Sequence, residues 1–339
     1  MKVAIYHNLK NGGGLLQINK IVEHMVYLGH KVKIFTYNKP QNYQNSFDEI
    51  TNILLFRKNI ERTISQQMID FQPNYFFVFP CHILQAPYVL RFLPKEKTIY
   101  FFLESKREFY EKTSFDYYTL KRIISRLIRY PEKFIDVKNC KSCKHIIANS
   151  KFSQTNLRKI YQKNSFVIYP GMKPISPINI KIRNNHKFLS FGLLTMLKGH
   201  HISAQLVPSV DILGQKSHEN IWKYLPKNKK IITNVKEKDK SEFFQKYSFF
   251  LASQINEPFG LTTLEAISNN CYVFGRNEGG TTEIIKDGIN GTILPVNNLK
   301  KAKDIINIIS KKKTITFKKT CIIDWGYTTK QVLDYIKHV

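Results

Sequence analysis

The feature that most constrains the fold is a series of short apolar runs separated by segments with helical periodicity. In the first half of the chain these runs, each of strand length, lie at residues 2–7, 31–37, 52–56, 75–79, 98–103, 145–149 and 166–170. Short apolar runs that alternate with helices are typical of a parallel sheet covered on both faces. The sequence therefore predicts an α/β fold.

The same pattern begins again after a proline-rich segment at residues 169–179. The second set of strand-like runs lies at residues 184–192, 210–214, 230–234, 248–253, 271–275 and 291–295. We therefore predict two Rossmann-like, doubly wound domains, residues 1–170 and 171–325, which face each other across a cleft. We expect the last helical pattern, residues 326–339, to pack back on the first domain.

The charge restricts the classes of partner. The 339 residues include 53 Lys and Arg against 25 Asp and Glu, a net charge of +28, and both halves of the chain are basic. Such a surface attracts nucleic acids, anionic lipids or phosphorylated substrates. No zinc finger, helix-turn-helix or RNA-recognition signature is visible, so we expect no nucleic-acid partner. A basic nucleic-acid-binding protein remains the less favoured alternative.

The start of the chain and its cysteines bear on location and cofactors. The opening residues MKVAIYHN predict a strand and not a signal peptide, so we expect a cytoplasmic protein with reduced cysteines. Cys140 and Cys143 form a single C-x-x-C pair, and the remaining cysteines do not add a second one at metal-ligand spacing. We therefore expect no metal and no other cofactor.

The stretch INEPFGLTTLEAISNN, residues 255–270, holds the strongest candidate site. Gly260 lacks a side chain, so a phosphate can approach its backbone, and a helix that starts near Leu261 presents unpaired N–H groups. Glu265 lies one turn inside that helix, where its carboxylate could bind the hydroxyls of a ribose. The alternative is a packed Pro-Phe turn flanked by solvated glutamates, and the spacing alone leaves both open.

This motif, followed by G-G-x-x-E-I-I-x-D-G-x-N-G at residues 279–291, resembles the donor site of the retaining glycosyltransferases of family four. The resemblance covers nearly the whole chain, because residues 145–161, 188–201 and 322–339 are similar to further segments of that family. It implies the GT-B fold, in which two Rossmann-like domains hold a nucleotide sugar.

The resemblance also implies roles for individual residues on the donor side. Glu257 and Lys198 would be catalytic: Glu257 would bind hydroxyls of the donor sugar, and Lys198 would neutralise the diphosphate. Glu265 would bind the nucleotide ribose. The remaining donor-binding positions would be Gly260, Leu261 and Thr262, whose backbone would meet the donor, and the loop of Gly12, Gly13 and Gly14, which would line the cleft opposite.

On the acceptor side, Glu104 and Arg107 match the family. Two positions depart from it, since Leu193 stands where an arginine is common and Leu103 where a histidine is common. His82, at the end of a neighbouring predicted strand, could replace that histidine, although a packing role is the simpler interpretation.

By the same resemblance the protein is a hexosyltransferase. It would move a sugar from a nucleoside-diphosphate sugar to a glycan or lipid-linked acceptor with retention, in the biosynthesis of a cell-envelope polysaccharide or glycolipid. A sugar-nucleotide epimerase or hydrolase of the same fold is the main alternative.

The segment TLKRIISRLIRY, residues 119–130, predicts an amphipathic helix. Its apolar residues, at spacings of three and four, are Leu120, Ile123, Ile124, Leu127 and Ile128. We favour a helix that faces the core. The alternative is a helix that lies in an anionic membrane surface, which would make the protein peripheral to the membrane; residues 105–170 carry 15 basic and five acidic residues.

Overall fold

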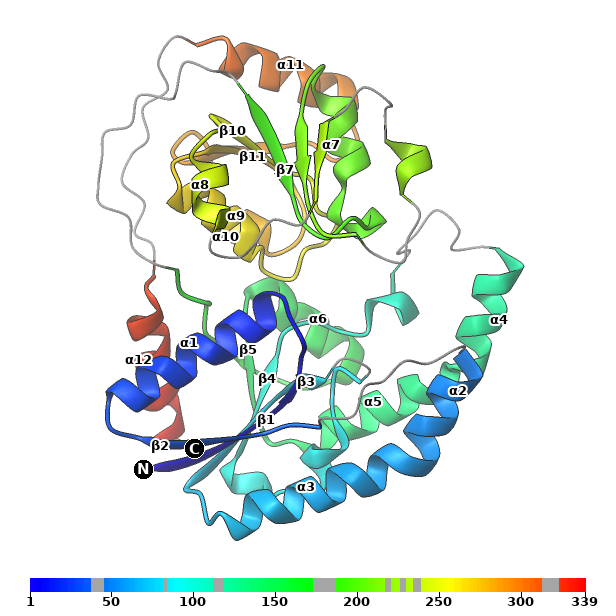
Figure 1. The fold of residues 1–339 in the computed structure, drawn as a ribbon, viewed down its shortest axis with the longest axis vertical. Coiled ribbons are helices and arrows are strands. Elements are labelled where there is room, and N and C mark those ends of the chain that lie inside the picture. The colour runs from blue at the N-terminus through cyan, green and yellow to red at the C-terminus, as the bar shows by residue number, and fades with distance from the viewer. Residues whose placement is uncertain are drawn as a thin grey trace. The chain divides into compact units, whose positions relative to one another are not determined.

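The computed structural model describes residues 1–37, 46–81, 84–111, 119–172, 187–216, 221–225, 230–233, 239–312 and 323–339. The chain divides into two compact units, one made of Met1–Gly171 with Trp325–Val339 and the other of Met172–Asp324. Each unit contains a six-stranded sheet, and every strand pair in both sheets is parallel (Figure 1). The predicted α/β fold is therefore confirmed.

The sheet of the first unit has the strand order β2-β1-β3-β4-β5-β6. The strands are β1 (Lys2–Asn8), β2 (Lys31–Phe35), β3 (Tyr75–Cys81), β4 (Thr98–Phe102), β5 (His145–Ala148) and β6 (Phe166–Val167). β4 is buried along its whole length, and β1 and β3 are buried except at their first residue, as expected for central strands with helices on both faces.

The α-helices of the first unit are α1 (Gly13–Tyr27), α2 (Ser46–Thr51), α3 (Lys58–Asp70), α4 (Leu120–Ile128), α5 (Tyr130–Ser142), α6 (Lys151–Tyr161) and α12 (Trp325–Ile336). Short helical turns are η1 (Asn52–Arg57), η2 (Tyr88–Arg91), η3 (Lys95–Lys97) and η4 (Arg107–Phe109). The C-terminal helix α12 packs beside α1, and its Val332 and Ile336 share a buried core with Ile18 and Ile21. The Tyr75 hydroxyl donates a hydrogen bond of 2.8 Å to the Ile336 carbonyl, which fixes the end of α12 against β3.

The predicted strand at residues 52–56 is wrong. These residues form η1, a π-helical turn that joins α2 to α3 without a break. Ile53 and Arg57, four positions apart, are buried, whereas the three residues between them are exposed. A short apolar run does not distinguish a strand from a helix, and here the spacing of the buried residues is helical.

The prediction that residues 119–130 form a core-facing helix is half right. The helix α4 forms, but none of its residues is buried. Leu120 is 73% exposed and Leu127 is 68% exposed, so the face that periodicity assigned to the core faces outward.

The second unit has the strand order β12-β11-β10-β7-β8-β9. Its strands are β7 (Phe188–Phe191), β8 (Asp211–Leu213), β9 (Lys230–Ile232), β10 (Phe249–Ala252), β11 (Tyr272–Arg276) and β12 (Gly291–Leu294). Its helices and turns are η5 (Met196–Lys198), α7 (His200–Leu206), η6 (Trp222–Tyr224), α8 (Lys240–Phe244), α9 (Leu261–Ser268), α10 (Thr281–Ile284) and α11 (Leu299–Ser310). Alternate residues of β10 enter separate cores: Phe249 and Leu251 lie in one, Phe250 and Ala252 in the other.

Within the described ranges, no helix combines the length and apolarity that crossing a bilayer requires. The same ranges contain no group of three or more His, Cys, Asp and Glu side chains arranged to hold a metal ion.

Candidate functional site

The candidate site lies in the second unit, after the carboxyl end of β10, where ligands bind in open α/β sheets. Gly260 precedes α9 with φ of +102°, in the left-handed region that favours glycine. A Cβ at this position would lie 3.3 Å from the Thr281 hydroxyl oxygen and 3.4 Å from that of Thr263, so the turn is also tightly enclosed. The Leu264 amide makes the first backbone bond of the helix, to the Gly260 carbonyl at 3.1 Å. The amides of Leu261 and Thr262 precede that bond and belong to the turn that attracts anions.

Lys198 and Glu257 are brought together by two loops. Lys198 is the last residue of η5, after β7, and Glu257 lies in the loop between β10 and α9. The Lys198 Nζ donates hydrogen bonds of 2.9 and 2.8 Å to the two carboxylate oxygens of Glu257. Their side chains are 29% and 16% exposed, so both remain within reach of a ligand.

Gly199 makes this approach possible. It has φ of +66°, and a Cβ at this position would lie only 1.8 Å from the Ser253 carbonyl oxygen. The Ile255 amide also donates a bond of 2.8 Å to the Leu197 carbonyl, which joins the same two loops. The residue after Lys198 therefore has to be glycine for the lysine to stand beside Glu257.

The second glycine pair supports the glutamate loop. The Gly280 amide donates a hydrogen bond of 2.7 Å to the Glu257 carbonyl. A Cβ at Gly279 would lie 2.7 Å from the Glu257 backbone, and one at Gly280 would lie 2.2 Å from the Pro258 carbonyl oxygen. A glycine pair before a helix can bind an anion, but α10 has only four residues, and the observed role of Gly279 and Gly280 is to pack against the loop.

Glu265 lies on α9, one turn beyond Gly260, and its side chain is 13% exposed. Lys240, the first residue of α8, places its Nζ 3.5 Å from the Glu265 carboxylate. The lysine ammonium offsets part of the cost of removing this carboxylate from water.

A buried polar cluster next to Lys198 was missed from sequence. His200 is fully buried; its Nδ1 lies 2.9 Å from the Ser190 hydroxyl and its Nε2 lies 3.2 Å from the Leu193 carbonyl. Burial lowers the pKa of His200 to about 4, so the ring is neutral near pH 7. The Ser203 hydroxyl extends the cluster by donating to Ser253 at 2.9 Å. The only sequence signal was the two histidines that directly follow Lys198-Gly199.

Leu193 precedes this cluster, at the position where an arginine was expected. Its side chain is 43% exposed and uncharged. Lys198 is a cation that the structure places in this part of the second unit, and a Cβ at Gly192 would lie 3.4 Å from its side chain.

The glycine loop lies in the first unit. Gly12 precedes α1 with φ of +89°, and Gly13 and Gly14 are its first two residues. A Cβ at Gly14 would lie 2.8 Å from Leu9 and 2.9 Å from Leu103. Leu103, which stands where a histidine was expected, therefore packs against the glycine loop. A larger residue at position 14 would displace the Leu103 side chain.

The acceptor-side residues lie after β4. Glu104 is half-buried between β4 and η4, and Arg107 begins η4 and donates to Glu111 at 2.8 Å. His82 lies outside the described residues.

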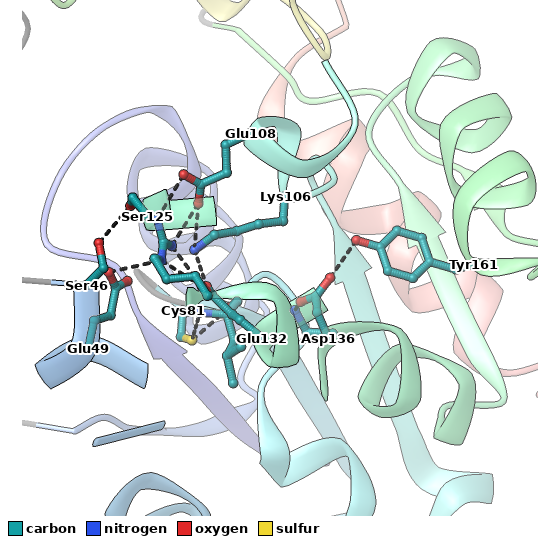
Figure 2. A network of polar contacts seen from close by, with 12 residues as sticks. Ser46, Glu49, Cys81, Lys106, Glu108, Ser125, Glu132, Asp136 and Tyr161 are labelled. Atoms are coloured by element: carbon teal, nitrogen blue, oxygen red, sulfur yellow. Dashed lines mark hydrogen bonds and ion pairs between the residues drawn. The ribbon is translucent and has the colours of Figure 1, made fainter. Parts of the chain in front are cut away.

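The same segment belongs to a buried network of charges that sequence reasoning did not find (Figure 2). Lys106 lies between two carboxylates, 2.5 Å from Glu132 and 3.5 Å from Glu108. Arg129, which directly follows α4, makes a paired contact with Glu108 at 2.8 and 2.9 Å and reaches Glu132 at 2.8 Å. Burial disfavours the charge of Lys106, but the two carboxylates outweigh it and raise its pKa. The network ties η4 to α4 and α5.

The segment that holds this site matches a known family. Residues 184–320 match the family described as Glycosyl transferases group 1. An uncharacterized glycosyltransferase of Methanocaldococcus jannaschii is 26% identical over 187 residues, which are 50% of this chain and 52% of the relative. The chain thus matches about half the length of that curated relative.

Solved structures are similar over nearly the whole chain. Anabaena HepE in complex with UDP-glucose has a TM-score of 0.66 and 17% identity over 100% of both chains. Sucrose-phosphate synthase of Thermosynechococcus elongatus has a TM-score of 0.73 and 12% identity over 99% of this chain and 98% of its own. The predicted GT-B fold is confirmed by this likeness. At these identities the likeness bears on the fold alone, and the assignment to retaining family four stays a prediction.

Proposed function

We propose that the protein is a hexosyltransferase that uses a nucleoside-diphosphate sugar as donor. The observation that carries the proposal is the Lys198–Glu257 pair, whose glutamate lies three residues before Gly260, in a segment that matches glycosyl transferases group 1. Such a donor has three parts: a diphosphate, a sugar and a nucleoside. Lys198 and the start of α9 suit the diphosphate, Glu257 suits the sugar, and Glu265 suits the ribose of the nucleoside.

The chemistry assigned to these residues is electrostatic. Negative charge builds up on the diphosphate as the bond to the sugar breaks, and a fixed ammonium with oriented N–H groups stabilises it. Lys198 and the amides of Leu261 and Thr262 would supply these groups. Glu257 would bind hydroxyls of the sugar, and Glu265 those of the ribose.

The finer parts of the proposal rest on the resemblance to retaining family-four enzymes. They are transfer with retention, a glycan or lipid-linked acceptor, and a role in cell-envelope polysaccharide or glycolipid biosynthesis. Work at the cytoplasmic face of a membrane without a metal cofactor rests instead on the opening strand, the cationic amphipathic segment at residues 119–130 and the cysteine spacing. The donor class has separate support, because HepE was solved in complex with UDP-glucose.

Thermal-shift measurements with UDP-, GDP- and ADP-sugars test the donor site. We expect one of them to stabilise the wild type. Glu265→Ala should abolish that stabilisation, and Glu257→Ala should remove only the part that the sugar adds over the nucleoside diphosphate alone. Glu242→Ala, which changes an exposed glutamate paired with Lys246, is the matched control. Equal stabilisation of the wild type and Glu265→Ala would refute the assigned site.

Product analysis then separates transfer from the alternatives. A transferase releases the nucleoside diphosphate faster when an acceptor is present, a hydrolase releases it without one, and an epimerase converts the sugar while it remains attached to the nucleotide.

A further inference from the structure

Helix α4 presents an apolar face outward. Five apolar residues at helical spacing are each between 36% and 73% exposed: Leu120, Ile123, Ile124, Leu127 and Ile128. Residues spaced by three and four positions lie on one side of a helix. Isolated exposed apolar residues are common, but a whole face of them marks an interaction surface.

The helical segment beside α4 also exposes apolar side chains. α2 packs beside α4, and the Ser46 hydroxyl lies 2.7 Å from that of Ser125 (Figure 2). Phe47 on α2 is 66% exposed. The η1 turn that continues α2 exposes three further apolar side chains, Leu54, Leu55 and Phe56.

The orientation of α4 is fixed by the charged network at its C-terminal end. Arg129 pairs with Glu108 and Glu132, and its Nε lies 3.2 Å from Glu49 of α2 (Figure 2). Its side chain is 12% exposed and that of Glu132 is fully buried. Rotating the apolar face inward would break these bonds and leave the buried Glu132 carboxylate with Lys106 as its remaining cation within the network. The exposure of the apolar face is therefore part of the fold.

The charges on α4 indicate what covers the face. Its charged residues are Lys121, Arg122 and Arg126, and it contains no acidic residue. The whole chain carries a net charge of +28. A helix with one apolar side and a cationic remainder suits the surface of an anionic bilayer, where apolar side chains enter the headgroup boundary and cations meet lipid phosphates.

We propose that α4, with Phe47 and the exposed side of η1, docks the protein on an anionic lipid bilayer. The proposal adopts the membrane alternative that the sequence left open for residues 119–130 and adds the exposed apolar residues of α2 and η1 to the docking surface. The docking itself does not depend on glycosyl transfer. Its consequence rests on the proposed function: the charged network joins α4 to η4, so docking would hold the acceptor-side residue Arg107 close to the membrane.

Vesicle flotation of the full chain tests the docking. Vesicles of phosphatidylcholine alone are compared with vesicles that also contain phosphatidylglycerol. We expect the wild type to float with the anionic vesicles only, and less strongly as salt is raised. Leu120→Ser/Leu127→Ser should lower the bound fraction about tenfold or more, because the variant can no longer bury two leucine side chains in the bilayer.

The control variant is Tyr27→Ser/Ile308→Ser, which changes two exposed apolar residues, 85% and 66% exposed, on α1 and α11. It should float like the wild type. Failure of the wild type to float, equal flotation of the α4 variant, or equal binding to phosphatidylcholine alone would each overturn the proposal.

Light scattering adds a further decisive measurement. A wild-type dimer that the α4 substitutions convert to a monomer would show that a second copy covers the face, and would also overturn the proposal. Thermal shifts with nucleotide sugars should be the same in the wild type and the α4 variant, so that a failure of docking and a failure of donor binding remain distinguishable.

Discussion

Lys198 donates hydrogen bonds to both carboxylate oxygens of Glu257, at 2.9 and 2.8 Å, across 59 positions of sequence. The contact exists because Gly199 lets the loop after β7 touch the loop after β10. The lysine is thereby held in one position before any substrate binds. A cation that needs no rearrangement at the moment of reaction is the form of charge stabilisation that accelerates catalysis most.

Replacement of this cation should affect turnover more than folding. We expect Lys198→Ala to lower kcat about 10²- to 10³-fold, as loss of one preorganised charge-stabilising group does. The loss in free energy of unfolding should stay near 1 kcal/mol, because the ion pair is partly exposed. Steady-state kinetics with urea unfolding measures both. Lys246→Ala, which breaks an exposed ion pair with Glu242, should change neither; wild-type turnover in Lys198→Ala would contradict the role.

Gly199 should tolerate no side chain. In Gly199→Ala the new Cβ would overlap the Ser253 carbonyl, and we expect a loss of about 3 kcal/mol or more in free energy of unfolding from this clash and the left-handed backbone. Gly288→Ala is a matched control, since its φ is +70° but a Cβ there meets nothing within 4 Å. It should lose only about 1 kcal/mol. Similar losses in the two variants, measured by urea unfolding, would show that the clash is relieved at little cost.

His200 should make stability depend on pH. Its pKa is about 4 in the folded chain because of burial, below the ordinary value of 6.5. The unfolded state therefore binds a proton that the folded state does not, so the contribution is fully present above pH 6.5 and is lost as pH falls toward 4. We expect the wild type to lose about 3 kcal/mol more than His200→Gln between these pH values.

Urea unfolding of both proteins at about pH 7 and about pH 4.5 measures this difference. His201, whose pKa is also lowered to about 4, is present in both proteins, so its contribution cancels in the comparison. Parallel pH profiles would show that His200 does not titrate in this range.

The sequence predicted those features that depend on neighbouring residues better than those that depend on tertiary packing. The glycine turn and Glu265 lie within one short motif, and the structure places that motif at the end of β10 and the start of α9. The apolar run at residues 52–56 was misread because a strand and a buried helical turn look alike over five residues. The face of α4 was assigned to the core because periodicity shows that a face is apolar but not what covers it.

The charged network could not be predicted from the sequence for a different reason. Its members, at positions 49, 106, 108, 129 and 132, come from three separate stretches of the chain, and only Arg129 and Glu132, three positions apart, have a spacing that could mark them as partners. In a chain so rich in lysine and arginine, a buried ion pair has the same local sequence as a solvated one. Only the packing of α2, α4 and α5 selects which charges meet.

Arg129 should be the most sensitive member of that network. Arg129→Ala would leave Glu108 and Glu132 with Lys106 as their remaining cation within the network, and we expect a loss of about 3 kcal/mol in free energy of unfolding. Arg129→Lys should recover only part of this, because an ammonium cannot reproduce the paired contact with Glu108.

A double variant identifies the cause of that loss. If the cost comes from two carboxylates that share one cation, Arg129→Ala/Glu108→Ala should be more stable than Arg129→Ala alone, because one of the two negative charges is removed together with Arg129. Lys337→Ala, which breaks an exposed pair with Asp334, serves as the control and should change stability little. Strictly additive losses in the two single variants would instead mean that Arg129 stabilises α4 through packing of its side chain and not through charge.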